Sequence, residues 1–196
     1  MSESENQNPH SNLSPASAPA KSVPRCKALL RKHGITLVLL AAIAWLWFRP
    51  PATVTDENRA APAWAVQLTD GRMLTSEQLK GKVVLINYWA TWCPYCLKEM
   101  PVIETFWQDH RDKGFEVLAV SVDDPPEKVA QYIKDHGYAF AAAPMDPSVY
   151  AAFGSAGSIP TSFIVDRDGV IRHKIVGQVH YPRLEKLVLP LLPKRN

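Results

Sequence analysis

Apolar residues in the C-terminal two-thirds of the chain occur in short runs separated by clusters of Gly, Pro and Asp, which is typical of alternating strands and helices. We predict strands at residues 64–68, 83–89, 116–122, 161–165 and 170–176. We predict a short capped turn at 75–78 and helices at 93–113, bent at Pro101, and at 127–136, 147–153 and 181–192. This order of elements indicates an α/β fold in which helices flank one central mixed sheet.

The first third of the chain has a different pattern. Residues 2–24 are rich in Ser, Asn, Pro and Ala, so we expect this segment to be disordered. Residues 34–48 contain no charged side chain. As a helix this stretch would be about 22 Å long, against a bilayer core of about 30 Å. It is either a thin transmembrane anchor or the core of a signal peptide, and a buried core helix is a third reading.

Two features favour an uncleaved anchor. Small residues at the spacing of a cleavage site are missing after the apolar stretch. Trp45 and Trp47 suit one membrane interface, and Arg31 and Lys32 suit the other. The predicted organisation is a disordered basic cytoplasmic tail at 1–33, the anchor at 34–48, a linker at 49–63 and one domain at 64–196.

Charge is unevenly distributed along the chain. The formal charge of +3 arises within residues 1–33, because the remaining acidic and basic residues cancel. The domain therefore has no basic surplus for binding nucleic acid. A basic flank before an apolar segment stays in the cytoplasm, so we expect the domain to be exported, into the periplasm of a Gram-negative cell. Cys26 would remain on the cytoplasmic side.

Cys93 and Cys96 form a Cys-x-x-Cys motif directly after the strand at 83–89 and at the start of the next helix. Two cysteines at this spacing can close into a small-ring disulfide and reopen. Unpaired backbone N–H groups and the positive end of the helix dipole favour a thiolate on the first cysteine. We therefore predict that Cys93 is the attacking nucleophile and that Cys96 resolves the mixed disulfide.

A Cys-x-x-Cys pair can also be half of a zinc site, which needs two further ligands at matching spacing. The third cysteine lies far away in the basic tail, and no His-x3–5-His pair occurs. The histidines that could complete such a site are His110, His136, His173 and His180. We expect no metal, and no cofactor other than a redox-active disulfide between Cys93 and Cys96.

Three separated motifs carry a resemblance to a known family. They are residues 83–96, which end in Trp-Cys-Pro-Tyr-Cys, then Glu99 with Pro101, and later Ser-Ile-Pro-Thr at 158–161 before a strand and an Asp-Gly hairpin. In this order they resemble the TlpA/ResA-like thioredoxins, which are membrane-tethered thiol-disulfide oxidoreductases facing the periplasm or cell exterior. The resemblance covers about residues 62–192. It implies a thioredoxin-like fold with an N-terminal β extension and a central insert.

The resemblance also implies roles for individual residues. Pro160 matches the thioredoxin cis-proline, and the backbone of Ile159 would then pair with an extended substrate segment. Asn87 stands where thioredoxin has a buried acid, and Asn cannot titrate. Glu99 stands where the family has a glutamate, one helical turn after Cys96, and could exchange a proton with the departing thiol. The alternatives are an ordinary loop proline and a glutamate on a helix surface.

The residues around the motif could contact the substrate or could serve only to pack the fold. Trp92, Pro94 and Tyr95 are predicted to face the substrate, and the residues between the cysteines tune the redox potential. We expect Trp89 to pack beneath the site. Either tryptophan could be purely structural. The insert, at residues 123–146, is where the family carries an extra strand and helix, and we expect it to help select the substrate.

These features predict a reductase of disulfides in exported proteins, with apocytochrome c as one candidate substrate. The Cys93 thiolate would attack a substrate disulfide, and Cys96 would then attack the Cys93 sulfur and release the reduced substrate. Continued reduction in an oxidising compartment needs electrons. The resemblance assigns that supply to a membrane thiol transporter of the DsbD/CcdA type.

Three other functions share part of this pattern. A periplasmic oxidase that donates disulfides uses the same residues, and the redox state of the dithiol in cells separates the two. A peroxiredoxin needs Pro-x3-Thr-x2-Cys, a spacing that the residues before Cys93 lack. A copper-binding assembly module uses Cys-x3-Cys with a distal histidine, for which His173 or His180 would serve, and copper titration would test it.

Overall fold

The computed structural model describes residues 38–43 and 53–193. The chain divides into two units, residues 1–49 and 50–196. In the first unit, residues 38–43 are helical and exposed. No helix within the described ranges is both long enough and apolar enough to cross a bilayer. The tail predicted at 1–33 and the two ends of the anchor predicted at 34–48 lie outside these ranges.

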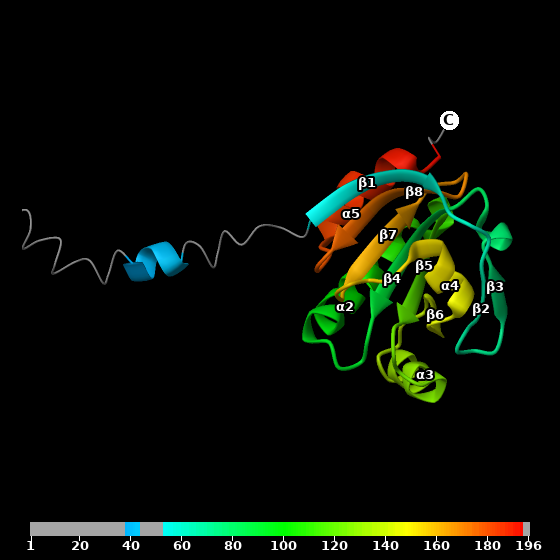
Figure 1. Ribbon diagram of the computed structural model, residues 1–196, viewed down its shortest axis with the longest axis horizontal. Coiled ribbons are helices and arrows are strands. Elements are labelled where there is room, and N and C mark those ends of the chain that lie inside the picture. The colour runs from blue at the N-terminus through cyan, green and yellow to red at the C-terminus, as the bar shows by residue number, and fades with distance from the viewer. Residues whose placement is uncertain (1–37, 44–52, 194–196) are drawn as a thin grey trace, which may run out of the picture. The chain divides into compact units, whose positions relative to one another are not determined.

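The second unit is built on a six-stranded sheet (Figure 1). Along the sheet the strands follow the order β1, β8, β7, β4, β5, β6. Their bounds are β1 Thr53–Ala60, β4 Val83–Trp89, β5 Phe115–Ser121, β6 Ala141–Pro144, β7 Thr161–Val165 and β8 Val170–Val176. β4 pairs in parallel with β5 and antiparallel with β7, which confirms the predicted mixed sheet.

The helices follow the predicted order with small differences at their ends. They are α2 Pro94–His110, α3 Pro126–Asp135, α4 Pro147–Phe153 and α5 Tyr181–Val188. Short 3-10 turns lie at η1 Glu77–Leu79, η2 Arg111–Lys113 and η3 Leu189–Leu191. The helices predicted at 93–113 and 181–192 thus each end in a 3-10 turn, and Pro101 lies inside α2.

Strand β4 is buried along its whole length and contributes to two apolar cores. Leu85 and Trp89 pack in the core that contains residues of α2, α3 and α5. Ile86 and Tyr88 pack in the other core, with residues of α4 and of the segment around β2. Because side chains alternate along a strand, Asn87 falls on the same face as Leu85 and Trp89, beneath helix α2.

A two-stranded ribbon precedes β4 in the chain. Its strands are β2 Ala65–Gln67 and β3 Met73–Thr75, which pair antiparallel. The turn predicted at 75–78 is capped reciprocally, because the Gln78 N–H donates to Thr75 Oγ1 and the Thr75 N–H donates to Gln78 Oε1. This ribbon is the predicted N-terminal β extension, and α3 and β6 lie within the predicted insert.

The linker predicted at 49–63 is wrong at residues 53–60, which form β1 and pair antiparallel with β8. Most β1 side chains are polar and exposed, so no alternation of apolar residues marks the strand in the sequence. Its pairing partner is the edge of β8, which supplies backbone hydrogen bonds that do not depend on apolar side chains. The domain therefore begins before position 64.

Candidate active site

Cys93 and Cys96 form a disulfide at the N-terminus of α2. Cys93 is the N-cap residue, and its Sγ accepts a hydrogen bond from the Cys96 N–H at 3.2 Å. Pro94 occupies the first position of the helix, where a missing N–H has no cost. Cys93 is 4% exposed and Cys96 is fully buried. The first sulfur is thus placed where free N–H groups favour negative charge, as the sequence predicted.

Glu99 lies one turn after Cys96 and is fully buried. Its Oε1 accepts a hydrogen bond from Asn87 Nδ2 at 2.7 Å, and its Oε2 accepts one from the Val179 N–H at 2.8 Å. Asn87 Nδ2 also lies 3.0 Å from Ser162 Oγ on β7. The carboxyl therefore connects α2 with the centre of the sheet and with the segment before α5. It is not on a helix surface, so that alternative is wrong.

The environment of Glu99 raises its pKa to about 7. Burial is the main cause, because it removes water from the charged form. The hydrogen bonds from Val179 and Asn87 act in the opposite direction and only partly offset it. A carboxyl with this pKa exchanges its proton near neutral pH, which an ordinary glutamate does not.

The Ile159–Pro160 peptide bond is cis, as the resemblance implied. Thr161, the next residue, pairs with Tyr88 near the end of β4, so the cis bond lies beside the end of the strand that leads to the dithiol. Ile159 and Trp92 line the same groove, which has a volume of about 460 Å³. The other lining residues are Val122, Met145, Tyr150, Ser155, Ala156, Gly157 and Ser158.

The aromatic residues near the motif divide into exposed and buried groups. Trp92 and Tyr95 are more than half exposed, and the Trp92 ring borders the groove. The Lys98 ammonium lies 5.7 Å from the centre of the Tyr95 ring. Trp89 is fully buried and packs against Tyr132, with ring centres 5.1 Å apart. The residues predicted to face the substrate are therefore accessible, and Trp89 is a core residue.

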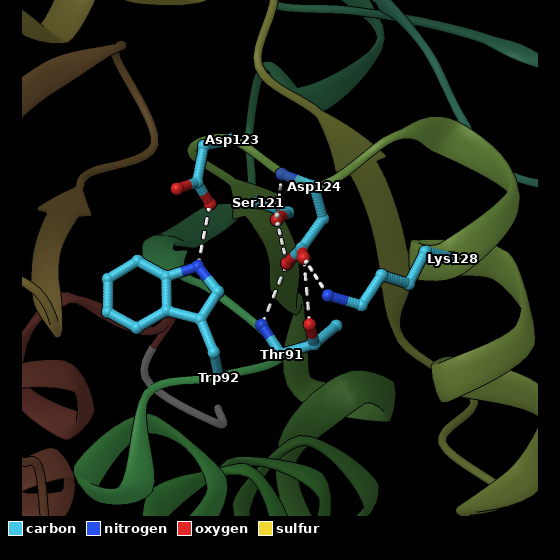
Figure 2. Close-up of polar contacts among 6 residues, drawn as sticks. All are labelled: Thr91, Trp92, Ser121, Asp123, Asp124 and Lys128. Atoms are coloured by element: carbon cyan, nitrogen blue, oxygen red, sulfur yellow. Dashed lines mark hydrogen bonds and ion pairs between the residues drawn. The ribbon is translucent and has the colours of Figure 1, made fainter.

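Asp123 and Asp124, in the loop between β5 and α3, are site residues that the sequence did not identify. The Asp124 carboxylate binds the backbone and hydroxyl of Thr91, and Asp123 accepts a hydrogen bond from the Trp92 indole (Figure 2). These partners are more than 30 positions apart in the chain, so no local pattern reveals the contact. The one available signal is two acids directly after a buried strand, at the edge where the dithiol also lies.

The histidines do not assemble around the dithiol. Among the residues that the structure describes, no group of three or more His, Cys, Asp or Glu side chains could hold a metal ion. His173 lies on β8 with its Nδ1 2.6 Å from Asp56 Oδ1, and His180 precedes α5 as its N-cap. The Nδ1 atoms of His110 and His136 each contact a carbonyl of the preceding helical turn.

A family model described as Redoxin matches residues 56–188. The thiol-disulfide oxidoreductase ResA of a Bacillus cereus strain is 32% identical over 168 residues, which are 84% of this chain and 97% of that protein. ResA of Bacillus anthracis is 31% identical over 137 residues, which are 69% of this chain and 79% of that protein.

Solved structures show the same relationship. A thiol:disulfide interchange protein of the thioredoxin family from Chlorobium tepidum TLS has a TM-score of 0.65 and 28% identity, over 70% of this chain and 98% of that chain. A putative thioredoxin from Neisseria meningitidis has a TM-score of 0.62 and 36% identity, over 69% and 91% of the two chains. The fold around the dithiol is therefore thioredoxin-like.

Proposed function

The chain belongs to the Redoxin family and is a thiol-disulfide oxidoreductase, and on this premise we propose that it reduces disulfides in exported proteins. The observation that carries the proposal is the arrangement at the start of α2. A cysteine pair there can open and close, and a buried carboxyl with a pKa of about 7 follows one turn later. Together they supply a nucleophile, a resolving thiol and a proton carrier.

The proposed reaction begins with the dithiol reduced. The Cys93 thiolate attacks one sulfur of the substrate disulfide, so that a mixed disulfide forms and the other substrate sulfur leaves as a thiolate, which takes up a proton. Cys96 then loses its proton and attacks the Cys93 sulfur. The second substrate sulfur leaves as a thiolate, which then takes up a proton, and the Cys93–Cys96 disulfide closes. The substrate gains two electrons and two protons. Both electrons and one proton, that of Cys96, come from the enzyme, and the other proton comes from the solvent.

In this scheme Glu99 is the group that takes the proton from Cys96. Cys96 is fully buried, so water has poor access to its thiol. Glu99 follows it by three positions, which places the two side chains on the same face of the helix. With a pKa of about 7, the Glu99 carboxyl exchanges its proton near neutral pH, so it can accept a proton in one half-reaction and return it in the next.

We place the substrate along the groove between Trp92 and Ile159. Pairing of an extended substrate segment with the backbone of Ile159 would present its disulfide to Cys93. Trp92, Pro94 and Tyr95 would contact the residues around that disulfide. Pro160 would keep the backbone of Ile159 facing the groove. The match of the residues around Pro160 to the family supports this role. One residue of the insert, Met145, borders the same groove, which supports a part for the insert in selecting the substrate.

The cellular setting is part of the proposal. Residues 34–48 would anchor the chain in the inner membrane, and the basic flank before them would keep the tail in the cytoplasm and the domain in the periplasm. Electrons would come from a DsbD/CcdA-type membrane protein. Apocytochrome c, whose haem-binding cysteines must be reduced, is the candidate substrate. The named relatives are thiol-disulfide oxidoreductases, which supports this class of substrate.

The test is to trap substrates with the full-length Cys96→Ala variant expressed in cells. Without the resolving thiol, mixed disulfides should accumulate on Cys93. They should disappear on treatment with dithiothreitol and in the Cys93→Ala/Cys96→Ala double variant, which is the matched control. Thiol labelling of the wild type should find the pair mostly reduced. A mostly oxidised pair would instead indicate a disulfide-donating oxidase, and the absence of any Cys93-linked adduct would contradict both functions.

A further inference from the structure

The Asp124 carboxylate is almost fully buried and accepts hydrogen bonds on both of its oxygens (Figure 2). Its Oδ2 accepts from the Thr91 N–H at 2.7 Å and from Ser121 Oγ at 2.8 Å. Its Oδ1 accepts from Thr91 Oγ1 and from Lys128 Nζ, both at 2.7 Å. One side chain thus connects the end of β4, the end of β5 and the first turns of α3.

Thr91 donates two hydrogen bonds, one from its backbone N–H and one from its hydroxyl, and both go to the Asp124 carboxylate. Thr91 lies two positions before Cys93. The Cys93 N–H donates to the Ala90 carbonyl at 3.2 Å, so residues 90–93 form a tight turn between β4 and α2. On the other side, the Trp92 indole N–H donates to Asp123 Oδ1 at 3.1 Å. The β5–α3 loop therefore holds the two residues immediately before Cys93 by their polar groups.

Burial works against ionisation of Asp124, yet its pKa is lowered to about 2. The hydrogen bonds from Lys128, from both groups of Thr91 and from Ser121 outweigh the cost of burial. Asp124 thus stays an anion throughout the pH range in which the dithiol works. It therefore does not exchange protons in the reaction, and any role of Asp124 must come from the hydrogen bonds that its carboxylate accepts.

We propose that Asp124 is a positioning residue for Cys93, which fixes Thr91 so that the Cys93 sulfur is presented in the orientation that attack on a protein disulfide requires. This inference rests on the proposed function. Thiol-disulfide exchange needs the attacking sulfur in line with the bond that breaks. A displacement of about 1 Å in a reacting group can reduce the rate by about 100-fold.

The chemistry of the site accounts for an aspartate rather than an asparagine. Four donors converge on two oxygens, and each oxygen accepts two of them. An Asn side chain has one oxygen and one NH2 group. In either orientation the NH2 group would face one group that can only donate, the Thr91 N–H or the Lys128 ammonium, so that hydrogen bond would be lost. Asp124→Asn therefore keeps the size of the side chain but loses the negative charge and one of the four hydrogen bonds, which weakens the connection between Thr91 and the β5–α3 loop.

Asp166 provides a matched control. It is also buried and accepts hydrogen bonds from the backbone N–H groups of Asp168 and Val170 and from Arg172 Nε. It follows β7 at the end of the sheet opposite the dithiol, because Val165 pairs with Val84 near the start of β4. Asp166→Asn thus breaks a comparable ion pair, between a buried aspartate and a partly exposed cation, without touching the turn that carries Cys93.

The experiment uses the full-length chain in detergent with its dithiol reduced. Three quantities are measured for the wild type, Asp124→Asn and Asp166→Asn: the thermal midpoint, the rate constant for reduction of insulin disulfides, and the rate of Cys93 alkylation by iodoacetamide. Both variants should lose thermal stability. Asp124→Asn should reduce insulin roughly tenfold more slowly than Asp166→Asn, which should match the wild type. The alkylation rate should be the same in all three proteins, because a small reagent can reach the Cys93 sulfur from more directions than a protein disulfide can.

A graded pair covers the case in which Asp124→Asn does not fold. Thr91→Val removes one of the four donors and should slow insulin reduction, whereas Thr91→Ser keeps that donor and should restore most of the rate. Equal insulin rates in Asp124→Asn and Asp166→Asn, or in the two Thr91 variants, would overturn the proposal. So would faster alkylation of Asp124→Asn, which would indicate an effect of charge. If the wild type itself does not reduce insulin, the proposed function fails instead.

Discussion

Two buried carboxyl groups lie near the dithiol, and their protonation differs. Glu99 follows Cys96 by three positions, and Asp124 accepts hydrogen bonds from Thr91 in the turn before Cys93. Glu99 accepts two hydrogen bonds, both from uncharged donors, and burial raises its pKa to about 7. Asp124 has little exposed surface but lies less deep than Glu99, and it accepts four hydrogen bonds, one from the half-exposed Lys128 ammonium. Its pKa falls to about 2. Burial alone therefore does not decide ionisation. The depth of burial and the number and charge of the donors together divide the two acids into a proton carrier and a permanent anion.

The largest expected effect of this difference is on stability. The pKa of Glu99 in the folded state, about 7, lies above its ordinary value of 4.5, so between these pH values the folded state holds a proton that the unfolded state has released. The free energy of unfolding should therefore fall as the pH rises from about 4.5 to about 7, by of order 3 kcal/mol. The difference between wild type and Glu99→Gln in denaturant unfolding measures this contribution.

Asp124 should behave in the opposite way. Its pKa in the folded state lies below its ordinary value of 3.8, so it stabilises the fold above about pH 4, and this contribution is lost as the pH falls towards 2. The difference between wild type and Asp124→Asn in the same unfolding experiment should shrink over that range. Differences that do not change with pH for either acid would break the comparison.

The next largest effect is on the reaction. Glu99→Gln removes the proton acceptor for Cys96, so resolution of the mixed disulfide should slow by about 100-fold near neutral pH. Rapid-quench measurement of the mixed-disulfide lifetime checks this. Glu104→Gln is the control, because Glu104 is a second buried carboxylate on α2 that bonds Gln108 and the Ala139 N–H. A similar loss of rate in both variants would mean that Glu99 acts only through the stability of the helix.

The smallest expected effect is a change in the pKa of Glu99 when its hydrogen bond from Asn87 is removed. Asn87→Leu keeps the approximate shape of the side chain and removes the hydrogen bond that favours the ionised carboxylate. A hydrogen bond to a charged group is worth about 1.5–3 kcal/mol, so the pKa of Glu99 should rise by about one to two pH units. Carbon-13 NMR titration of the carboxyl carbon measures it. Ser162→Ala removes the other partner of Asn87, and a pKa change as large as in Asn87→Leu would contradict this assignment.

Much of this arrangement could be predicted from the chain because it depends on local pattern. The apolar run of β4 and the cysteines at the next helix start fixed the position of the dithiol, and the spacing of Glu99 from Cys96 gave its place on α2. The direction in which Glu99 points was not predictable from the helix alone. It depends on the sheet, because the position of Asn87 along β4 puts its side chain on the face beneath α2, where it meets Glu99.

The features that sequence reasoning missed depend on contacts between distant segments. β1 has polar, exposed side chains and pairs through its backbone with β8, which comes more than 100 residues later. The Asp124 contacts join two loops that meet only because β4 and β5 are neighbours in the sheet. Neither arrangement leaves a periodic pattern, so the tertiary structure was needed to find them.

The most direct test of the whole account is the rate at which the reduced full-length chain transfers electrons to insulin, with dithiothreitol as the electron supply. We predict catalysed reduction of the insulin disulfides by the wild type, and only the background rate with Cys93→Ser. A wild-type rate equal to the background rate would contradict disulfide exchange through Cys93, on which the assigned roles of Glu99 and Asp124 depend.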